Sequence, residues 1–142
     1  PYLAAAGELK TKPTQHSVKT LLEAGIQPDI LVCRTEHHLG SDIKRKVARF
    51  CNVEREAVIE SMDASTIYEV PLLMQKEGLD KIVLKKLGLE DNTEVKLEKW
   101  NKFLTNLQNP KQEITIGLVG KYVELQDAYK SISEAIIIKP FF

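Results

Sequence analysis

Apolar residues near the start of the chain follow first a helical and then a strand-like spacing. Residues 13–24 carry apolar side chains at helical intervals and are followed by Gly25, which is well placed as a left-handed stop, so they predict an amphipathic helix. The predicted apolar stripe comprises Val18, Leu21 and Leu22. The continuous apolar run at residues 30–33 then predicts a parallel strand that is covered on both faces.

The same alternation repeats in the next segment. Ser41 is a good N-cap for a helix over residues 42–51, whose apolar stripe comprises Ile43, Val47 and Phe50. The short apolar run at residues 57–59 predicts a second strand. The order helix, strand, helix, strand favours a parallel α/β sheet with right-handed crossovers. Residues 62–65 would lie at the carboxyl end of the second strand, where open α/β sheets bind ligands.

Residues 66–89 predict two short helices that close the first domain. Pro71 is expected to break the pattern near its start, and Gly88 ends it. The apolar stripe of the second of these helices comprises Leu79, Ile82, Val83 and Leu87.

From residue 90 to residue 112 the composition is polar, which indicates an interdomain linker. One helical island, residues 95–107, shares a stripe of Leu97, Trp100, Leu104 and Leu107, and Asn109 and Pro110 end it. Residues 114–120 then predict a buried strand that leads into a glycine turn, with a helix from about residue 128. Residues 136–142 make a poor amphipathic helix and are an atypical tail.

Composition narrows the class of protein. The 142 residues are 43% hydrophobic, enough for one modest core, and 20 basic residues balance 20 acidic ones, which does not favour nucleic acid or an anionic membrane as partner. Cys33 and Cys51 lack CxxC spacing, and no apolar run approaches the roughly 20 residues of a membrane span. We expect a cytoplasmic protein with buried, reduced cysteines. The chain begins without methionine, which suggests a part of a longer protein.

The segment at residues 7–17 has the features of an anion site. Lys10 and Lys12, two apart in an extended segment, would project to the same side, and Pro13 would open a helix whose first N–H groups attract phosphate. Thr11 and Thr14 add hydroxyl donors, and the Gln15 amide can both donate to and accept from a nucleobase. The alternative is an ordinary helix start with two solvated lysines.

Other polar clusters give weaker signals. The basic cluster Lys44, Arg45, Lys46 and Arg49 is typical of a solvated helix face. His16 adjoins the anion segment but is expected to orient backbone, and the neighbours His37 and His38 lack partners at metal spacing, so no zinc site is predicted. Residues 117–121 are not a phosphate-binding P-loop, because only two residues separate the glycines and Tyr122 follows the lysine.

The run GELKTKPTQHS at residues 7–17, followed by GIQPDILVCR at residues 25–34, closely resembles the signature of the CTP synthase family, the glutamine-dependent enzymes that aminate UTP. GLVGKY and DAYKS in the second half are similar to the start of that family's glutaminase domain. The resemblance implies a P-loop-NTPase-like, Rossmann-like three-layer amidoligase fold for residues 1–89. It further implies a helical linker at 90–112, the first strand and helix of a class I glutamine amidotransferase domain at 113–135, and the tail at 136–142.

The resemblance also implies the chemistry of a ligase of pyrimidine biosynthesis. ATP phosphorylates the oxygen at position 4 of the UTP ring, and ammonia released from glutamine displaces that phosphate. Residues matching the UTP site, which CTP shares as feedback inhibitor, are Lys10, Thr11, Lys12, Pro13, Thr14, Gln15 and Lys46. Residues matching the ATP site are Arg34, Met62, Asp63 and Ala64. Two alternatives stay open: Arg34 could merely pair with a nearby carboxylate, and Lys46 could be one solvated lysine among several.

Several parts of that enzyme have no match in this chain. The phosphate loop and the magnesium carboxylates are expected before Pro1 and the glutaminase cysteine after Ala135, so we expect no catalytic residue, no metal ligand and no CTP synthesis from these residues alone. The family implies ATP and Mg²⁺, with glutamine as donor, GTP as effector and a homotetramer or filament. Rival hypotheses are a non-catalytic nucleotide-binding or assembly module, and a related amidoligase with another acceptor, against which the KTKPTQ run argues.

Overall fold

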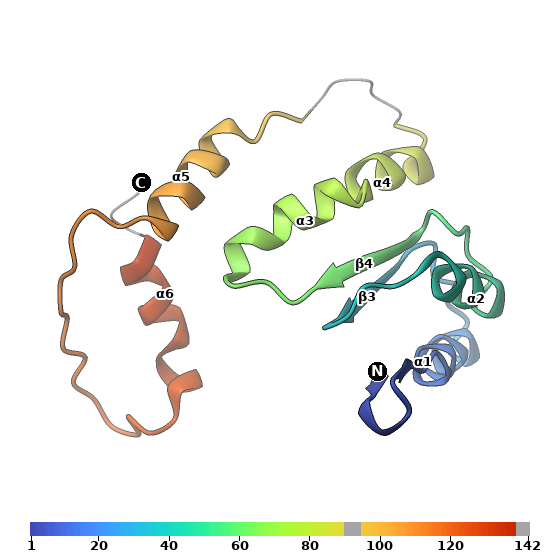
Figure 1. The fold of residues 1–142 in the computed structure, drawn as a ribbon, viewed down its shortest axis with the longest axis horizontal. Coiled ribbons are helices and arrows are strands. Elements are labelled where there is room, and N and C mark those ends of the chain that lie inside the picture. Colours follow the sequence, from blue (N-terminus) through green and yellow to red (C-terminus); the bar gives the residue numbers. More distant parts are fainter. Residues whose placement is uncertain (90–94, 139–142) are drawn as a thin grey trace. The chain divides into compact units, whose positions relative to one another are not determined.

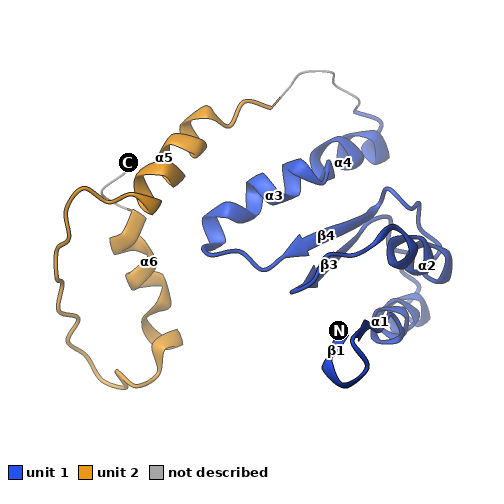
Figure 2. Ribbon diagram, in the orientation of Figure 1, with its two compact units in different colours: residues 1–93 blue, residues 94–142 orange. Residues whose placement is uncertain are grey.

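The computed structural model describes residues 1–89 and 95–138, and the chain divides into two compact units. Unit 1 comprises residues 1–93 and unit 2 comprises residues 94–142 (Figure 2).

Unit 1 is a small mixed α/β structure (Figure 1). Its strands are β1 (Tyr2–Leu3), β2 (Glu8–Leu9), β3 (Leu31–Thr35) and β4 (Val58–Met62), and its α-helices are α1 (Lys12–Glu23), α2 (Ser41–Cys51), α3 (Val70–Lys76) and α4 (Leu79–Leu87). Short 3-10 helices are η1 (Ala4–Ala6) and η2 (Ile67–Glu69). The alternation of helix and strand that the apolar pattern predicts is therefore confirmed.

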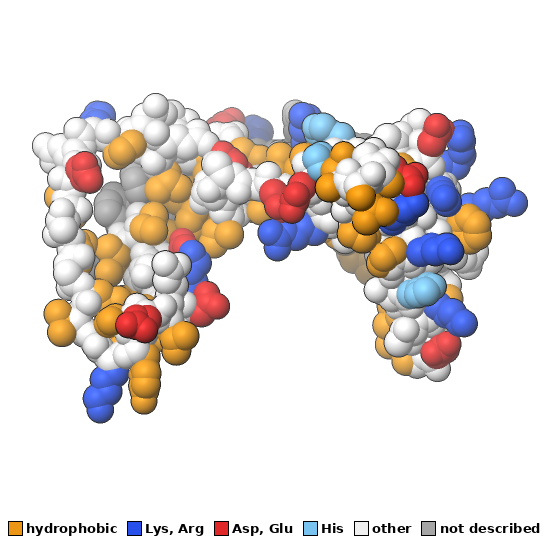
Figure 3. Space-filling view, turned by 60° about the horizontal axis from the view of Figure 1, so that its bottom comes forward, with side chains coloured by type: hydrophobic (Ala, Val, Ile, Leu, Met, Phe, Trp, Pro, Cys, Tyr) orange, Lys and Arg blue, Asp and Glu red, His pale blue; other side chains and the backbone are white. Residues whose placement is uncertain are grey.

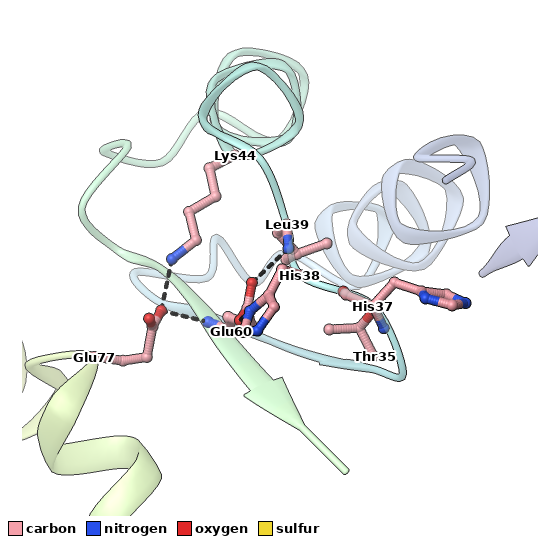
Figure 4. A network of polar contacts seen from close by, with 7 residues as sticks. All are labelled: Thr35, His37, His38, Leu39, Lys44, Glu60 and Glu77. Carbon is pink, nitrogen blue, oxygen red and sulfur yellow. Dashed lines mark hydrogen bonds and ion pairs between the residues drawn. The ribbon is translucent and has the colours of Figure 1, made fainter. Parts of the chain in front are cut away.

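The centre of unit 1 is the parallel pair β3 and β4. They align from Leu31 opposite Val58 to Thr35 opposite Met62, with α2 as the crossover between them. Helices α2 and α3 both pack against β4 and lie on opposite sides of it (Figures 1 and 4). A short antiparallel hairpin of β1 and β2 precedes α1. The small parallel sheet agrees with the predicted parallel α/β class.

The core lies between the strand pair, α1 and α2. Its buried members are Val18, Val47, Ala48, Cys51 and Val58, with Leu31, Cys33, Ile43 and Val53 packed against them. Both cysteines are free, and burial raises the pKa of each thiol. Cys51 is buried as expected, whereas Cys33 is half-buried.

The prediction that residues 30–33 are covered on both faces is wrong. Exposure alternates along β3, and Val32 is 53% exposed, although its register partner Ile59 in β4 is 1% exposed. The face of the pair that carries Val32 and Ile59 is therefore covered over β4 but not at Val32. Parts of the predicted helix stripes are also wrong. Leu21 and Leu22 of α1, Phe50 of α2 and Leu87 of α4 are exposed.

Helix ends differ from the prediction in physically simple ways. Gly40, not Ser41, is the N-cap of α2, and Ser41 is its first residue. Pro71 does not break a helix but lies in the first turn of α3, where its missing N–H costs nothing. Gly78, with φ of 76°, separates α3 from α4, and Gly88, with φ of 65°, ends α4 as predicted.

Unit 2 contains α5 (Glu98–Gln108), a 3-10 helix η3 (Gln126–Tyr129) and α6 (Lys130–Ile138). Phe103 and Leu104 of α5 are buried, and Asn109 caps its end. The predicted strand at residues 114–120 is wrong: this segment is not a strand and Val119 is 95% exposed, since no described strand pairs with it.

The tail prediction is partly wrong, because α6 continues through Ile138. The remaining tail residues 139–142, and residues 90–94 of the predicted linker, lie outside the described residues.

Across residues 1–89 and 95–138, none of the helices has the length and apolar character needed to traverse a lipid bilayer.

Candidate functional site

The predicted anion segment connects the hairpin to α1. Gly7 adopts φ of 61° between β1 and β2, and the Lys10 N–H donates to the Pro1 carbonyl at 2.9 Å. Thr11 has helical backbone angles, with φ of −93° and ψ of −16°, and Lys12 is the first residue of α1. The expectation that Lys10 and Lys12 share one side of an extended segment is therefore wrong, because the helix begins between them.

Thr11 is the buried member of this segment, with 6% of its surface exposed. Its hydroxyl accepts a hydrogen bond from Nε2 of Gln15 at 3.1 Å, and its carbonyl accepts from the Gln15 N–H at 3.1 Å. No side chain caps the N-terminus of α1. Lys12 and Pro13 are exposed, and Thr14 is half-buried. The arrangement leaves first-turn N–H groups available beside exposed lysine, which suits an anion.

Lys46 reaches this region from a different element. It lies on α2, which packs against α1, and its side chain is exposed. The pKa of Glu8 is lowered mainly by its ion pair with Lys10, and the charge of Lys46 lowers it further. Of these two lysines, Lys10 is the one that forms an ion pair with Glu8. Lys and Arg side chains gather on this side of unit 1, over α1 and α2 (Figure 3).

The second predicted cluster lies at the carboxyl ends of β3 and β4. Arg34 is in β3, Met62 ends β4, and Asp63 and Ala64 follow it. Nε of Arg34 donates to Oδ1 of Asp63 at 2.8 Å, which raises the pKa of the guanidinium, and the Asp63 N–H donates to the Thr35 carbonyl at 3.1 Å. The structure brings all four predicted residues together, and it also realises the alternative that Arg34 pairs with a carboxylate.

A polar network between these two clusters was not predicted (Figure 4). The carboxylate of Glu60, in β4, is buried, accepts the Leu39 N–H and lies 2.6 Å from Nδ1 of His38. The Glu60 N–H donates to Oε2 of Glu77 at 2.9 Å, and Nζ of Lys44 contacts the same oxygen at 2.6 Å. The one feature of the sequence that could have indicated this network is a glutamate, Glu60, directly after the apolar run at residues 57–59.

His37 and one cavity lie outside this network. The His37 ring packs on Tyr2 with centroids 4.0 Å apart. Among the described residues, no group of three or more His, Cys, Asp or Glu side chains could hold a metal ion. A cavity of about 360 Å³ at the amino ends of β3 and β4 contains none of the predicted site residues; it is lined by Gln27, Pro28, Asp29, Asn52, Val53, Glu54 and Lys86.

Comparison with known proteins shows the family of this chain. The family model described as "CTP synthase N-terminus" matches residues 1–89. Over 137 residues, 96% of this chain, the sequence is 68% identical to a CTP synthase of Christiangramia forsetii, 68% to one of Flavobacterium psychrophilum and 63% to one of Methanocaldococcus jannaschii. The chain covers 25%, 26% and 25% of these relatives, about a quarter of their length. The match to the family model over most of unit 1 shows that the chain belongs to the CTP synthase family.

Proposed function

We propose that this chain supplies nucleotide-binding residues of a CTP synthase, which aminates UTP to CTP with ATP and with ammonia from glutamine. The observation that carries the proposal is the uncapped N-terminus of α1, which begins at the exposed Lys12 on a helix that packs against α2, the helix that carries Lys46. A triphosphate needs several positive charges at once, and two lysines with a helix N-terminus provide them.

The roles of the residues follow from their chemistry. Lys10, Lys12 and Lys46 hold the UTP or CTP triphosphate, with Thr11, Pro13 and Thr14 forming the helix start that faces it. Glu8 holds the Lys10 ammonium until the more highly charged phosphate replaces it. The Gln15 amide already donates to Thr11, so its carbonyl oxygen is left to accept from the nucleobase.

We propose that ATP binds at the carboxyl edge of β3 and β4. The exposed Arg34 guanidinium packs on the adenine, and backbone groups of Met62, Asp63 and Ala64 contact the edge of the ring. Asp63 fixes the guanidinium for this role. The described residues offer no ligand cluster for Mg²⁺, so no step is assigned to a metal on this chain.

Further proposals concern the domain boundaries, the glutamine donor, the effector and the assembly. We propose that residues 1–89 are the end of an amidoligase domain, 90–112 a linker and 113–135 the start of a glutamine amidotransferase domain. Glutamine, the GTP effector, and a tetramer or filament belong to the same proposal, as does a cytoplasmic location.

The test is titration calorimetry of the chain with UTP, CTP and ATP. Lys10→Ala, Lys12→Ala and Lys46→Ala should each weaken UTP binding about ten-fold. The matched control is Lys19→Ala, which removes an exposed lysine of α1 that pairs with Glu23. The proposal fails if UTP does not bind, or if all three variants bind UTP as the control does.

Turnover requires a second assay. The product of the whole reading frame that contains this chain should convert UTP with ATP and glutamine, and also with ammonia. UTP binding without any turnover by that product would favour the non-catalytic nucleotide-binding module. Turnover of a different acceptor would favour a related amidoligase.

A further inference from the structure

Two lysines of α2 point in opposite directions. At 100° per residue, Lys44 and Lys46 project from faces about 200° apart. Lys44 falls in register with the buried residues Val47, Ala48 and Cys51, at spacings of three, four and seven, whereas Lys46 lies on the exposed side. Lys44 thus occupies a position where the helix pattern favours an apolar residue.

The half-buried Lys44 is held by Glu77, in the turn after α3. Its ammonium lies 2.6 Å from Oε2 of Glu77, and the same oxygen accepts the Glu60 N–H at 2.9 Å. Burial alone would raise the pKa of Glu77, but the hydrogen bonds from Lys44 and from the Glu60 backbone outweigh it, so the pKa lies below its ordinary value. One ionised oxygen therefore joins α2 to β4.

The Glu60 side chain makes a second tie to the start of α2. It is 8% exposed, and its two oxygens meet the Leu39 N–H and Nδ1 of His38. An ionised carboxylate only accepts hydrogen bonds, so it pairs with the His38 tautomer that carries a proton on Nδ1. Leu39 immediately precedes Gly40, the N-cap of α2. Both sets of contacts include Glu60 (Figure 4). One reaches Leu39, just before α2, and the other reaches Lys44, at the end of the first turn of α2, through Glu77.

A strand glutamate with a buried side chain is a costly choice for stability alone. Removing a carboxylate from water is unfavourable unless its hydrogen bonds are satisfied, and an apolar residue at the same place needs no partners. The five residues His38, Leu39, Lys44, Glu60 and Glu77, here called the α2 brace, instead fix the first turn of α2 against β4 and α3. Lys46 follows directly after this fixed turn, on the opposite face.

We propose that the α2 brace positions Lys46 for the triphosphate of UTP, so that Lys44, Glu60 and Glu77 set UTP affinity without touching the nucleotide. This inference rests on the function proposed above. The brace acts by orientation: with α2 held at its start, Lys46 keeps its place on a helix that packs against α1, whose N-terminus is the proposed triphosphate site. Loosening the helix start lets the Lys46 ammonium leave the site.

The test is a double-mutant cycle between the brace and Lys46, read as UTP affinity by titration calorimetry. Glu60→Gln keeps the side-chain shape but can accept at only one of its two contacts, and Glu77→Gln removes the charge that Lys44 meets. Each should weaken UTP binding about five-fold. Combined with Lys46→Ala, neither should weaken it further than Lys46→Ala alone, because both act through that lysine.

The matched control is Glu54→Gln, which removes a carboxylate that pairs with Lys86 at the amino end of β4 and should leave UTP affinity unchanged. Circular dichroism establishes that each variant is folded, and if Glu60→Gln is not, Glu77→Gln and Lys44→Met carry the cycle. Losses that add to that of Lys46→Ala, or no loss in the brace variants while Lys46→Ala still weakens binding, overturn this inference alone. Absence of UTP binding by the unmodified chain overturns the proposed function as well.

Discussion

The guanidinium Nε of Arg34 lies 2.8 Å from Oδ1 of Asp63, so a residue of β3 is fixed by the residue that follows β4. Arg34 is 84% exposed and Asp63 is 43% exposed, and ion pairs in such surroundings contribute little to stability because water screens them. The contact limits the directions that the guanidinium can take at the carboxyl edge of the sheet. The ion pair therefore orients the Arg34 guanidinium and adds little to the stability of the fold.

Asp63→Asn separates these two effects. The variant should unfold at the same temperature as the unmodified chain, whereas its affinity for ATP should fall about three-fold because Arg34 is no longer held. Calorimetric titration with ATP and thermal unfolding give the two values. Asp42→Asn, which breaks the exposed contact of Asp42 with Arg45 at 2.7 Å, is the control. An unchanged ATP affinity would leave Asp63 as a surface partner of Arg34 only.

Thr11→Val tests the buried hydroxyl at the start of α1. Valine preserves the shape but cannot accept the hydrogen bond from Nε2 of Gln15, so the free energy of unfolding should fall by about 1 kcal/mol. UTP affinity should fall as well, since Gln15 loses the contact that orients its amide. Urea unfolding and calorimetry measure the two changes. Ser17→Ala, which removes a hydroxyl bonded to the Pro13 carbonyl on the exposed side, is the control.

The apolar pattern predicted the part of the fold that local spacing determines. The order α1, β3, α2, β4 follows from periodicity, and the candidate ATP residues meet because parallel strands bring their carboxyl ends to one edge. Burial of each face depends instead on what packs there. Val32 and residues 114–120 are as apolar as core residues, yet they are exposed because no described element covers them.

The candidate site residues come from the sequence, but the geometry in which they are held could not be predicted from it. The spacing of Lys10 and Lys12 is the same in a strand and in a helix start, and only the backbone of Thr11 shows that the helix begins between them. The contacts of the α2 brace join residues 17 to 33 positions apart in the chain, which no local period can reveal. In the sequence, nothing distinguishes Lys44 and Glu60 from other charged residues. In the structure, the Lys44 ammonium and the Glu60 N–H both contact Oε2 of Glu77.

Ile59 and Val32 are register partners on one face of the parallel pair, yet they should respond differently to truncation because only Ile59 is covered. Ile59 is 1% exposed, so Ile59→Val should lower the free energy of unfolding by about 1 kcal/mol, because the deleted methylene leaves a cavity. Val32→Ala, at a position of β3 that is 53% exposed, should change it by less than about 0.5 kcal/mol. Urea unfolding of both variants measures the contrast. Equal losses would mean that Val32 is covered in solution.

Glu77 should make the stability of unit 1 depend on pH in the acid range. Its pKa in the folded chain lies below the ordinary value, so the ionised form is stabilised by folding. That stabilisation is fully present above the ordinary glutamate pKa of about 4.3 and is lost as the pH falls below it, through the folded-state value. Glu77→Gln cannot titrate and should be less stable than the unmodified chain at neutral pH.

The measurement is urea unfolding of both proteins between neutral pH and about pH 3, which extends below the ordinary glutamate range. The stability difference between them should be largest at neutral pH and should shrink as the solution is acidified. Protonation removes the negative charge of Glu77, and the substitution removes the same charge at every pH. Glu56→Gln, at an exposed position, should give a difference that is small at every pH. A Glu77 difference that stays constant on acidification would mean that hydrogen bonding to a neutral oxygen is sufficient, and that the charge on Lys44 does not stabilise the brace.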